Sequence, residues 1–170
     1  MRPLAMAGRL TIGHGTSLES PLPGALWAAW GRGRGLGNLF TDEIRALIDP
    51  PRVGVLGTTN KDGTPLLTPV WYAREGDELW LVIPPDGPKT RNLRRDPRVT
   101  FLVMDERGYT YVTIRGTARL ESGEEGTKPR EMAIRYLGEE AGRRFAERDY
   151  IKEEIVCRIT PTGMRLRRDG

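Results

Sequence analysis

The sequence predicts a mainly β domain in which six to seven antiparallel strands form a small, closed or nearly closed barrel with two or three helices. β-rich segments recur between residues 52 and 168, and short turns rich in Gly, Pro, Asn and Asp separate them. The helix expected between the third and fourth strands has only about two turns, whereas a parallel crossover takes a dozen residues or more. The strands are therefore expected to pair antiparallel.

The first elements follow from capping and turn signals. Thr41 is a suitable N-cap, and the two acidic residues after it complement the helix dipole. Apolar residues at 44, 47 and 48 share one face of this helix, and Pro50-Pro51 ends it. Strands are predicted at residues 52–58, 65–73 and 78–83, with turns at 60–63 and 74–77. Together these strands predict a three-stranded meander.

The stretch from residue 83 to residue 98 carries the strongest functional signal. Pro84-Pro85 stops the third strand, Gly87 permits a tight turn, and Pro88 fits the first turn of a short helix that Asp96-Pro97 ends. Within residues 89–98, five cations accompany one acid, Asp96: Lys89, Arg91, Arg94, Arg95 and Arg98. Charge alone is equally typical of a solvated basic helix. The strand, turn and helix start together favour a phosphate site at the helix N-terminus, with Lys89 and Thr90 beside it.

The second half of the chain predicts four strands and one helix. The strands cover residues 98–104, 109–120, 154–160 and 164–168, and the last two flank a turn at residues 161–163. Gly116 indicates a bulge or a close backbone approach. An amphipathic helix is predicted over about residues 128–148, with Met132 and Phe145 on its apolar face.

Composition limits the class of protein. The 170 residues predict one domain, and the Gly-rich residues 1–38 predict a flexible Gly/Arg-rich leader before a domain at residues 39–170. Residues 1–40 hold three units of the net charge of +4, which argues against a nucleic-acid partner. No apolar run approaches the roughly 20 residues that span a bilayer, so a cytoplasmic protein without a membrane partner is expected. One cysteine and one histidine predict no disulfide and no His/Cys metal site.

Three segments, read together, resemble the split-barrel flavin-binding superfamily of pyridoxamine 5′-phosphate oxidase. They are residues 55–65, residues 68–72 (Thr-Pro-Val-Trp-Tyr) and residues 89–98 (Lys-Thr-Arg-Asn-Leu-Arg-Arg-Asp-Pro-Arg). The third segment is most similar to the branch that uses the deazaflavin coenzyme F420, and residues 116–118 also fit that branch. The resemblance implies a split β-barrel homodimer with cofactor sites along the subunit interface. A dimer would also cover the long strand at residues 109–120, if that strand is exposed.

The resemblance also implies which residues contact the cofactor. The segment Thr68, Pro69, Val70 and Trp71 runs beside the tricyclic ring, and Trp71 is expected to form a pocket wall. Val82 and Ile83 lie near the ring and ribityl chain, Lys89 and Thr90 hold the phosphate, and Asn92 follows one turn later. Residues 82–84 lack the Ser or Thr of many relatives, and Gly87 replaces an Arg found in some. Fewer direct phosphate and ribityl contacts follow from these departures.

The function expected from these residues is that of an F420-dependent oxidoreductase, which transfers a hydride between the deazaflavin and a small organic substrate. The cofactor supplies the hydride, so no catalytic side chain is assigned. One alternative keeps the fold but binds FMN, with chemistry like that of pyridoxamine phosphate oxidase. Another is a non-catalytic flavin or deazaflavin carrier. Backbone and apolar groups around the site leave the substrate unspecified.

Overall fold

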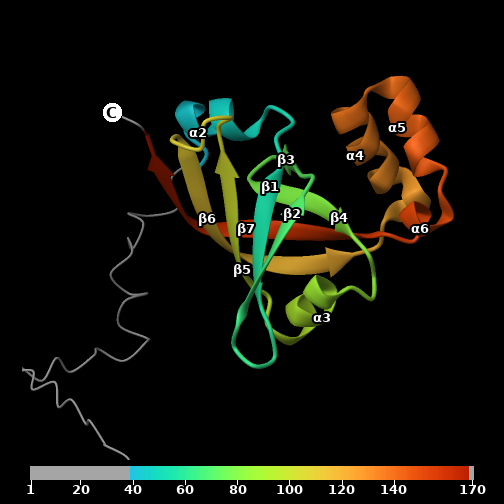
Figure 1. Ribbon diagram of the computed structural model, residues 1–170, viewed down its shortest axis with the longest axis horizontal. Helices are drawn as coiled ribbons and strands as arrows, with labels where there is room; N and C mark the ends of the chain where they lie inside the picture. Colours follow the sequence, from blue (N-terminus) through green and yellow to red (C-terminus); the bar gives the residue numbers. More distant parts are fainter. Residues whose placement is uncertain (1–38, 169–170) are drawn as a thin grey trace, which may run out of the picture. The chain divides into compact units, whose positions relative to one another are not determined.

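The computed structural model describes residues 39–168, so the expected leader at residues 1–38 lies outside the described residues. In the described part of the chain, seven antiparallel strands form one sheet in the order β2-β1-β5-β6-β7-β4-β3 (Figure 1). The described residues also form five α-helices and one 3-10 helix. The prediction of a mainly β fold with six to seven antiparallel strands is confirmed.

The first helix and the first hairpin form as predicted. Helix α2 (Asp42–Ile48) begins after Thr41, whose side-chain oxygen accepts a hydrogen bond from the Ile44 N–H at 3.4 Å. Its three buried residues, Ile44, Leu47 and Ile48, belong to the main hydrophobic core. Strands β1 (Gly54–Thr59) and β2 (Pro65–Val70) then pair across the turn at residues 60–63.

The three-stranded meander, by contrast, is wrong. Residues 65–73 are not one strand: β2 ends at Val70, and β3 (Ala73–Glu75) pairs with β4 (Glu78–Ile83) instead of β1. Strands β2 and β3 therefore lie at opposite edges of the sheet, and Trp71 and Tyr72 connect them. Tyr72 is fully buried, and its hydroxyl donates to the Ile48 carbonyl at 2.8 Å. This buried side chain anchors the segment in which the chain crosses from one edge of the sheet to the other.

Helix α3 (Pro88–Arg95) and strand β5 (Arg98–Met104) have the predicted bounds. Strand β6 (Tyr111–Glu121) lies between β5 and β7 (Ile155–Arg167), so it is not the exposed strand that a dimer was expected to cover. A Cβ at Gly116 would lie 2.6 Å from the Thr160 carbonyl oxygen, which confirms the predicted close approach.

The two final strands predicted at residues 154–160 and 164–168 are one continuous strand, β7. The turn expected at residues 161–163 is a register shift in the pairing of β6 with β7, located between Arg115 and Gly116. Because an irregularity of this kind accommodates an extra residue within a ladder, the proline and glycine there bend the strand without ending it.

The single helix predicted over residues 128–148 is also wrong. The chain forms a 3-10 turn η1 (Glu124–Gly126) and helices α4 (Thr127–Leu137), α5 (Glu139–Ala146) and α6 (Asp149–Lys152). Gly138 ends α4 with φ 80° and ψ 170°, a conformation that favours glycine. A Cβ at Gly142 would lie 2.5 Å from the backbone N and Cα of Ile134, so the glycine lets α5 lie directly against α4.

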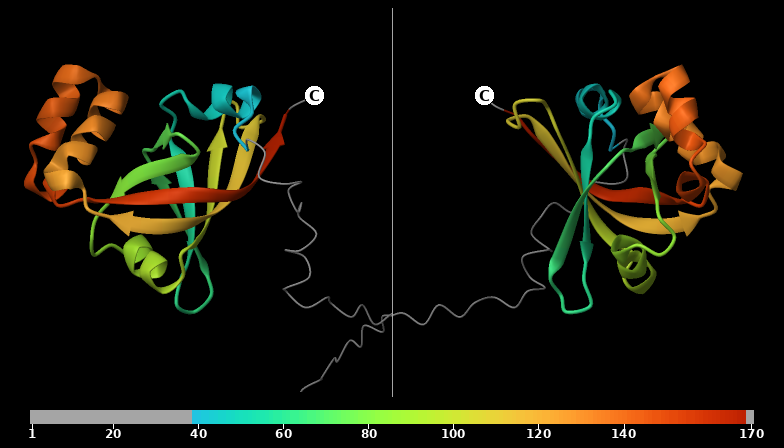
Figure 2. Two further views of the ribbon diagram at one scale, coloured as in Figure 1. Left: turned by 180° about the vertical axis from the view of Figure 1, so that it is seen from behind. Right: turned by 45° about the vertical axis from the view of Figure 1, so that its right-hand side comes forward.

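We call helices α4 to α6 the helical cap. Figure 2 shows them gathered together at the end of the sheet where β6 ends and β7 begins. One small hydrophobic cluster, which includes Met132 and the strand residues Trp80 and Val156, joins the cap to the sheet. A second, which includes Ala133 and Ile151, lies within the cap, and Trp71 packs against both clusters. Among the described helices, none is both long enough and apolar enough to cross a membrane.

Candidate functional site

A cavity of about 430 Å³ lies where the helical cap meets β2, β4 and α3. Its volume falls within the range of roughly 300–1,000 Å³ that is typical of small-molecule sites. The lining is mostly apolar and consists of Val53, Pro69, Val70, Trp71, Val82, Pro84, Lys89, Pro129, Met132, Phe145, Ile151 and Glu154. Two of these lining side chains carry charge, Lys89 and Glu154. The cavity is therefore suited to a flat apolar ligand with one polar end.

The cavity brings together five of the nine site residues predicted from the sequence. Pro69, Val70 and Trp71 come from the end of β2 and the crossing segment, Val82 comes from β4, and Lys89 comes from the first turn of α3. These residues come from three separate elements, and the fold places them around one space.

The other four predicted residues do not line the cavity. Thr68 is half-buried within β2 and pairs with Leu56, and Ile83 is fully buried in the core. The Thr90 hydroxyl donates to the Pro84 carbonyl at 2.6 Å. The Asn92 amide donates to Thr58 Oγ1 at 3.1 Å and to Asn60 Oδ1 at 2.9 Å. Thr90 and Asn92 thus hold α3 against its surroundings, and cofactor contact by these four residues stays a prediction.

Trp71 forms a rigid wall of the cavity. Its ring stacks on that of Tyr136 with centroids 4.9 Å apart and an interplanar angle of 10°. The Phe145 ring lies 5.6 Å away in a tilted arrangement. The Tyr136 hydroxyl donates to the Arg52 carbonyl at 2.6 Å and accepts from the Tyr72 N–H at 3.1 Å. The cap therefore holds both the aromatic wall and the crossing segment.

Only one of the five cations in the basic stretch lines the cavity, and that is Lys89. The Arg91 guanidinium donates to the Asp86 carbonyl, Arg95 donates to Asn92 Oδ1 at 3.2 Å, and Arg98 pairs with Asp96 at 2.7 Å. Arg94 is exposed. The arginines therefore contact groups of α3 and its flanking residues or face solvent. Of the five cations in this stretch, Lys89 is the one that lines the cavity.

Lys89 and Glu154 are the polar end of the cavity. Burial lowers the pKa of Lys89 and raises the pKa of Glu154, and the charge of each residue partly offsets the shift of the other. Neither side chain has a hydrogen-bond or ion-pair partner among residues 39–168. Retaining charged groups without partners in an apolar cavity costs stability. Groups with perturbed pKa values in a concave site are typical of functional sites.

Sequence reasoning missed seven of the lining residues: Val53, Pro84, Pro129, Met132, Phe145, Ile151 and Glu154. Met132 and Phe145 were assigned to the apolar face of a single helix. In the structure they lie on two helices, α4 and α5, and both line the cavity. Gly138 and Gly142 are the local signals for the two-helix arrangement. Glu154 carries no such signal, because an acid before a strand is a common feature of surfaces.

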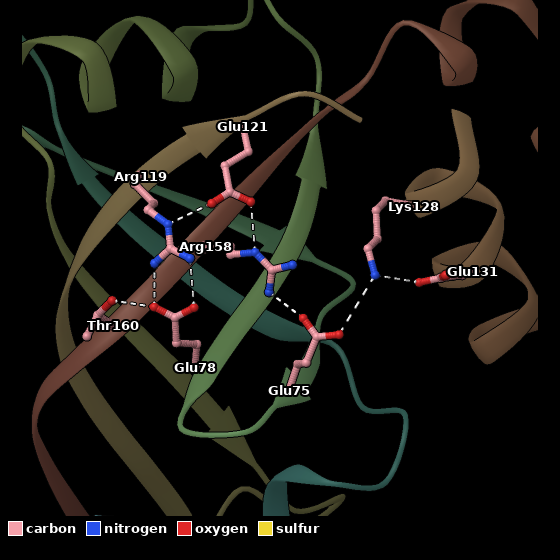
Figure 3. A network of polar contacts seen from close by, with 8 residues as sticks. All are labelled: Glu75, Glu78, Arg119, Glu121, Lys128, Glu131, Arg158 and Thr160. Carbon is pink, nitrogen blue, oxygen red and sulfur yellow. Dashed lines mark hydrogen bonds and ion pairs between the residues drawn. The ribbon is translucent and has the colours of Figure 1, made fainter. Parts of the chain in front are cut away.

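An ion-pair network holds the start of α4 against the sheet (Figure 3). Arg119 and Arg158 bridge three glutamates on β3, β4 and β6, namely Glu75, Glu78 and Glu121. Lys128 joins the network from α4 with its ammonium 2.9 Å from Glu131 and 3.8 Å from Glu75, and 5.0 Å from the centroid of the Trp80 ring. Pro129 and Met132 follow in the same helix, so the network positions one wall of the cavity.

Glu154→Gln is expected to raise the melting temperature at neutral and alkaline pH. Because burial raises the pKa of Glu154, the folded state binds its proton more tightly than the unfolded state. The associated stability is present in full below the unfolded pKa of about 4.3 and is lost as pH rises through the folded pKa. In thermal melts at a series of pH values, the melting temperature of the variant should therefore exceed that of wild type by an amount that increases with pH. The control is Glu153→Gln, an exposed neighbour, and equal curves for the two variants would contradict the assignment.

The fold is that of a split barrel, and the cavity has a volume typical of small-molecule sites. The family profile for pyridoxamine 5′-phosphate oxidase matches residues 40–168, and the chain belongs to this family. The match confirms the resemblance inferred from residues 55–98. The family includes oxidoreductases, and its members bind flavin or F420 cofactors.

Several solved structures are similar to this chain. An F420 reductase shares 25% sequence identity over 71% of this chain and 94% of its own, with a TM-score of 0.63. A conserved hypothetical protein from Mycobacterium tuberculosis shares 29% identity over 76% of this chain and 85% of its own, also with a TM-score of 0.63. A candidate pyridoxamine 5′-phosphate oxidase from Listeria innocua, at 24% identity and a TM-score of 0.57, covers 74% of this chain and 95% of its own and supports the fold alone.

Proposed function

We propose that the protein is a cytoplasmic oxidoreductase that binds coenzyme F420 and transfers a hydride between this deazaflavin and a small organic substrate. The main support is the cavity, where the end of β2, the end of β4 and Lys89 line one space of suitable volume. The similarity to an F420 reductase supports the choice of cofactor.

The lining residues fit a tricyclic cofactor with an anionic side chain. Trp71, Pro69 and Val82 offer flat apolar walls to a ring, and Lys89 offers a charge-assisted hydrogen bond to a phosphate. A bound reduced deazaflavin supplies the hydride. The protein orients the ligands, and its apolar walls exclude water from them. Because residues 82–84 and 87 supply no hydroxyl or guanidinium, Lys89 bears most of the phosphate binding.

FMN is the second candidate cofactor, and membership of the pyridoxamine 5′-phosphate oxidase family favours it. A protein that purifies yellow, with flavin fluorescence, would select FMN. A colourless protein that takes up added F420 would select the deazaflavin. Binding of either cofactor without turnover of any reductase substrate would leave the carrier function.

Lys89→Ala is expected to weaken cofactor binding by about 10- to 150-fold, because it removes a charge-assisted hydrogen bond contributing roughly 1.5–3 kcal/mol. Fluorescence titration with F420 and with FMN measures the effect. Arg94→Ala is the matched control, since Arg94 is an exposed cation on the same helix, and its effect should stay under about tenfold. Added salt should weaken F420 binding more than FMN binding because of the acidic oligoglutamate tail. Unchanged affinity in Lys89→Ala would contradict the proposal that Lys89 binds the phosphate.

The protein is further expected to form a homodimer, which the family resemblance implies. In place of β6, the contact surface is expected at edge strand β2, where Leu67 is 67% exposed, and before β1, where Val53 is 53% exposed. Light scattering at micromolar concentration should give twice the chain mass for the wild type and a larger monomer fraction for Leu67→Glu. Leu137→Glu, at a 41% exposed site on the cap, is the control and should leave the mass unchanged. A monomeric wild type would contradict the proposal.

A further inference from the structure

Glu154 lies one residue before β7 and lines the same cavity as Lys89. The resemblance assigns no role to this carboxyl group, and nothing in the proposed hydride transfer uses it. Its neighbours in the lining are apolar, including Pro84, Val82 and Ile151. A ligand anion that reaches Lys89 therefore shares the cavity with a half-buried carboxyl group.

The other charged groups around the cavity do not act on Glu154. On α6, Lys152 pairs with Asp149, and on α4, Lys128 pairs with Glu131. On α5, Arg143 and Arg144 pair with Glu139 and Glu140, and the Arg148 that follows lies over the Phe145 ring. On α3, Arg91 and Arg95 bond to backbone carbonyl groups. Among the described residues, Lys89 is the one charge that contributes to the pKa shift of Glu154.

An ionised Glu154 and a bound anion compete for the single ammonium of Lys89. Like charges in a site of low effective dielectric repel strongly, and the repulsion is relieved when the carboxylate is protonated. A protonated carboxyl group can also donate a hydrogen bond to an anion oxygen. Burial raises the pKa of Glu154 in the free protein, which lowers the cost of taking up this proton.

We propose that Glu154 takes up one proton from solvent when the anionic group of a ligand binds Lys89, so that the cavity binds phosphate-bearing ligands more tightly as pH falls. The proton returns to solvent when the ligand leaves. Glu154 thereby discriminates between ligands by charge, since a neutral ligand of the same shape requires no proton. The inference deepens the proposed function and rests on it for the identity of the ligand.

The test compares wild type with Glu154→Gln in titrations of FMN and riboflavin between about pH 5 and about pH 8. FMN itself gains charge near pH 6, so the variant supplies the reference curve. The ratio of the variant's FMN affinity to that of wild type should rise with pH, by up to about tenfold per pH unit, the limit for one proton. For riboflavin, which lacks the phosphate, the ratio should stay constant. The same pH profile for FMN in both proteins would overturn the proposal.

A calorimetric titration gives an independent count of protons. In buffers of different ionisation enthalpy, wild type should take up about one proton more per FMN than Glu154→Gln does. Glu153→Gln, at the exposed neighbouring residue, should behave as wild type. A difference of zero protons between wild type and Glu154→Gln would also overturn the proposal.

The design separates this inference from the proposed function. If neither F420, FMN nor riboflavin binds at any pH, the proposed function fails, and phenyl phosphate becomes the probe because it needs only the cavity and Lys89. A thermal shift with phenyl phosphate that declines more steeply with rising pH in wild type than in Glu154→Gln would support proton uptake. No shift, or the same pH dependence in both proteins, would overturn it.

Discussion

Tyr72→Ala is expected to lower the free energy of unfolding by about 3–5 kcal/mol, the usual cost of truncating a buried aromatic side chain. Tyr72 is fully buried, and its ring meets Phe101 edge-on with centroids 5.1 Å apart. Its hydroxyl also ties the crossing segment to the end of α2 through the Ile48 carbonyl. Urea denaturation followed by tryptophan fluorescence measures the change.

Tyr72→Phe is the matched control, because it keeps the ring and removes only the hydroxyl. It should cost about 1–3 kcal/mol, since it leaves the Ile48 carbonyl without this donor. A loss in Tyr72→Ala no larger than that in Tyr72→Phe would show that the ring contributes little to the core. It would then be wrong to treat Tyr72 as the anchor of the crossing.

Gly142→Val is expected to destabilise the helical cap by about 3 kcal/mol, at the upper end of overpacking costs, and to abolish ligand binding in the cavity. The new Cβ would meet backbone atoms of Ile134 at 2.5 Å, and backbone cannot move aside as a side chain can. Hydrogen exchange should show loss of protection in α4 and α5 while the strands stay protected.

Arg143→Val is the control for the lower helix propensity of valine, because Arg143 is an exposed residue of the same helix. It should leave both cap protection and ligand binding nearly intact. Gly142→Val with wild-type exchange and wild-type affinity would mean that α4 and α5 can separate without harm. The cap would then not be a wall of the site.

Local signals in the sequence predicted the elements whose first and last residues are set by neighbouring residues in the chain. Pro88 and Asp96-Pro97 bound α3, and Thr41 caps α2, because each signal acts on its own backbone. The pairing of β4 with β7 could not be predicted in this way. It joins residues 79–83 to residues 155–159, and no turn residue encodes a contact at that separation.

The same distinction between local and long-range signals separates the site residues that were predicted from those that were missed. Lys89 and Trp71 were predicted because they lie in segments that resemble the family. The cap wall was missed because a glycine within an apolar helical pattern is compatible with either one helix or two. Gly142 becomes informative only once α4 lies beside it. Glu154 gains its meaning from burial opposite Lys89, which follows from the tertiary fold.

The position of β7 in the sheet has a consequence for the order of events during synthesis. In the described sheet, β3 and β4 are joined to the other strands through β7 alone, and β7 is the last of the described strands to be made. A nascent chain that ends before residue 155 can form the β2-β1-β5-β6 ladder and the β3-β4 hairpin as separate pieces. Long-range strand pairing of this kind is slow and leaves edges open to association. The ligand cavity, which residues of both pieces line, is therefore completed only after β7 has been made.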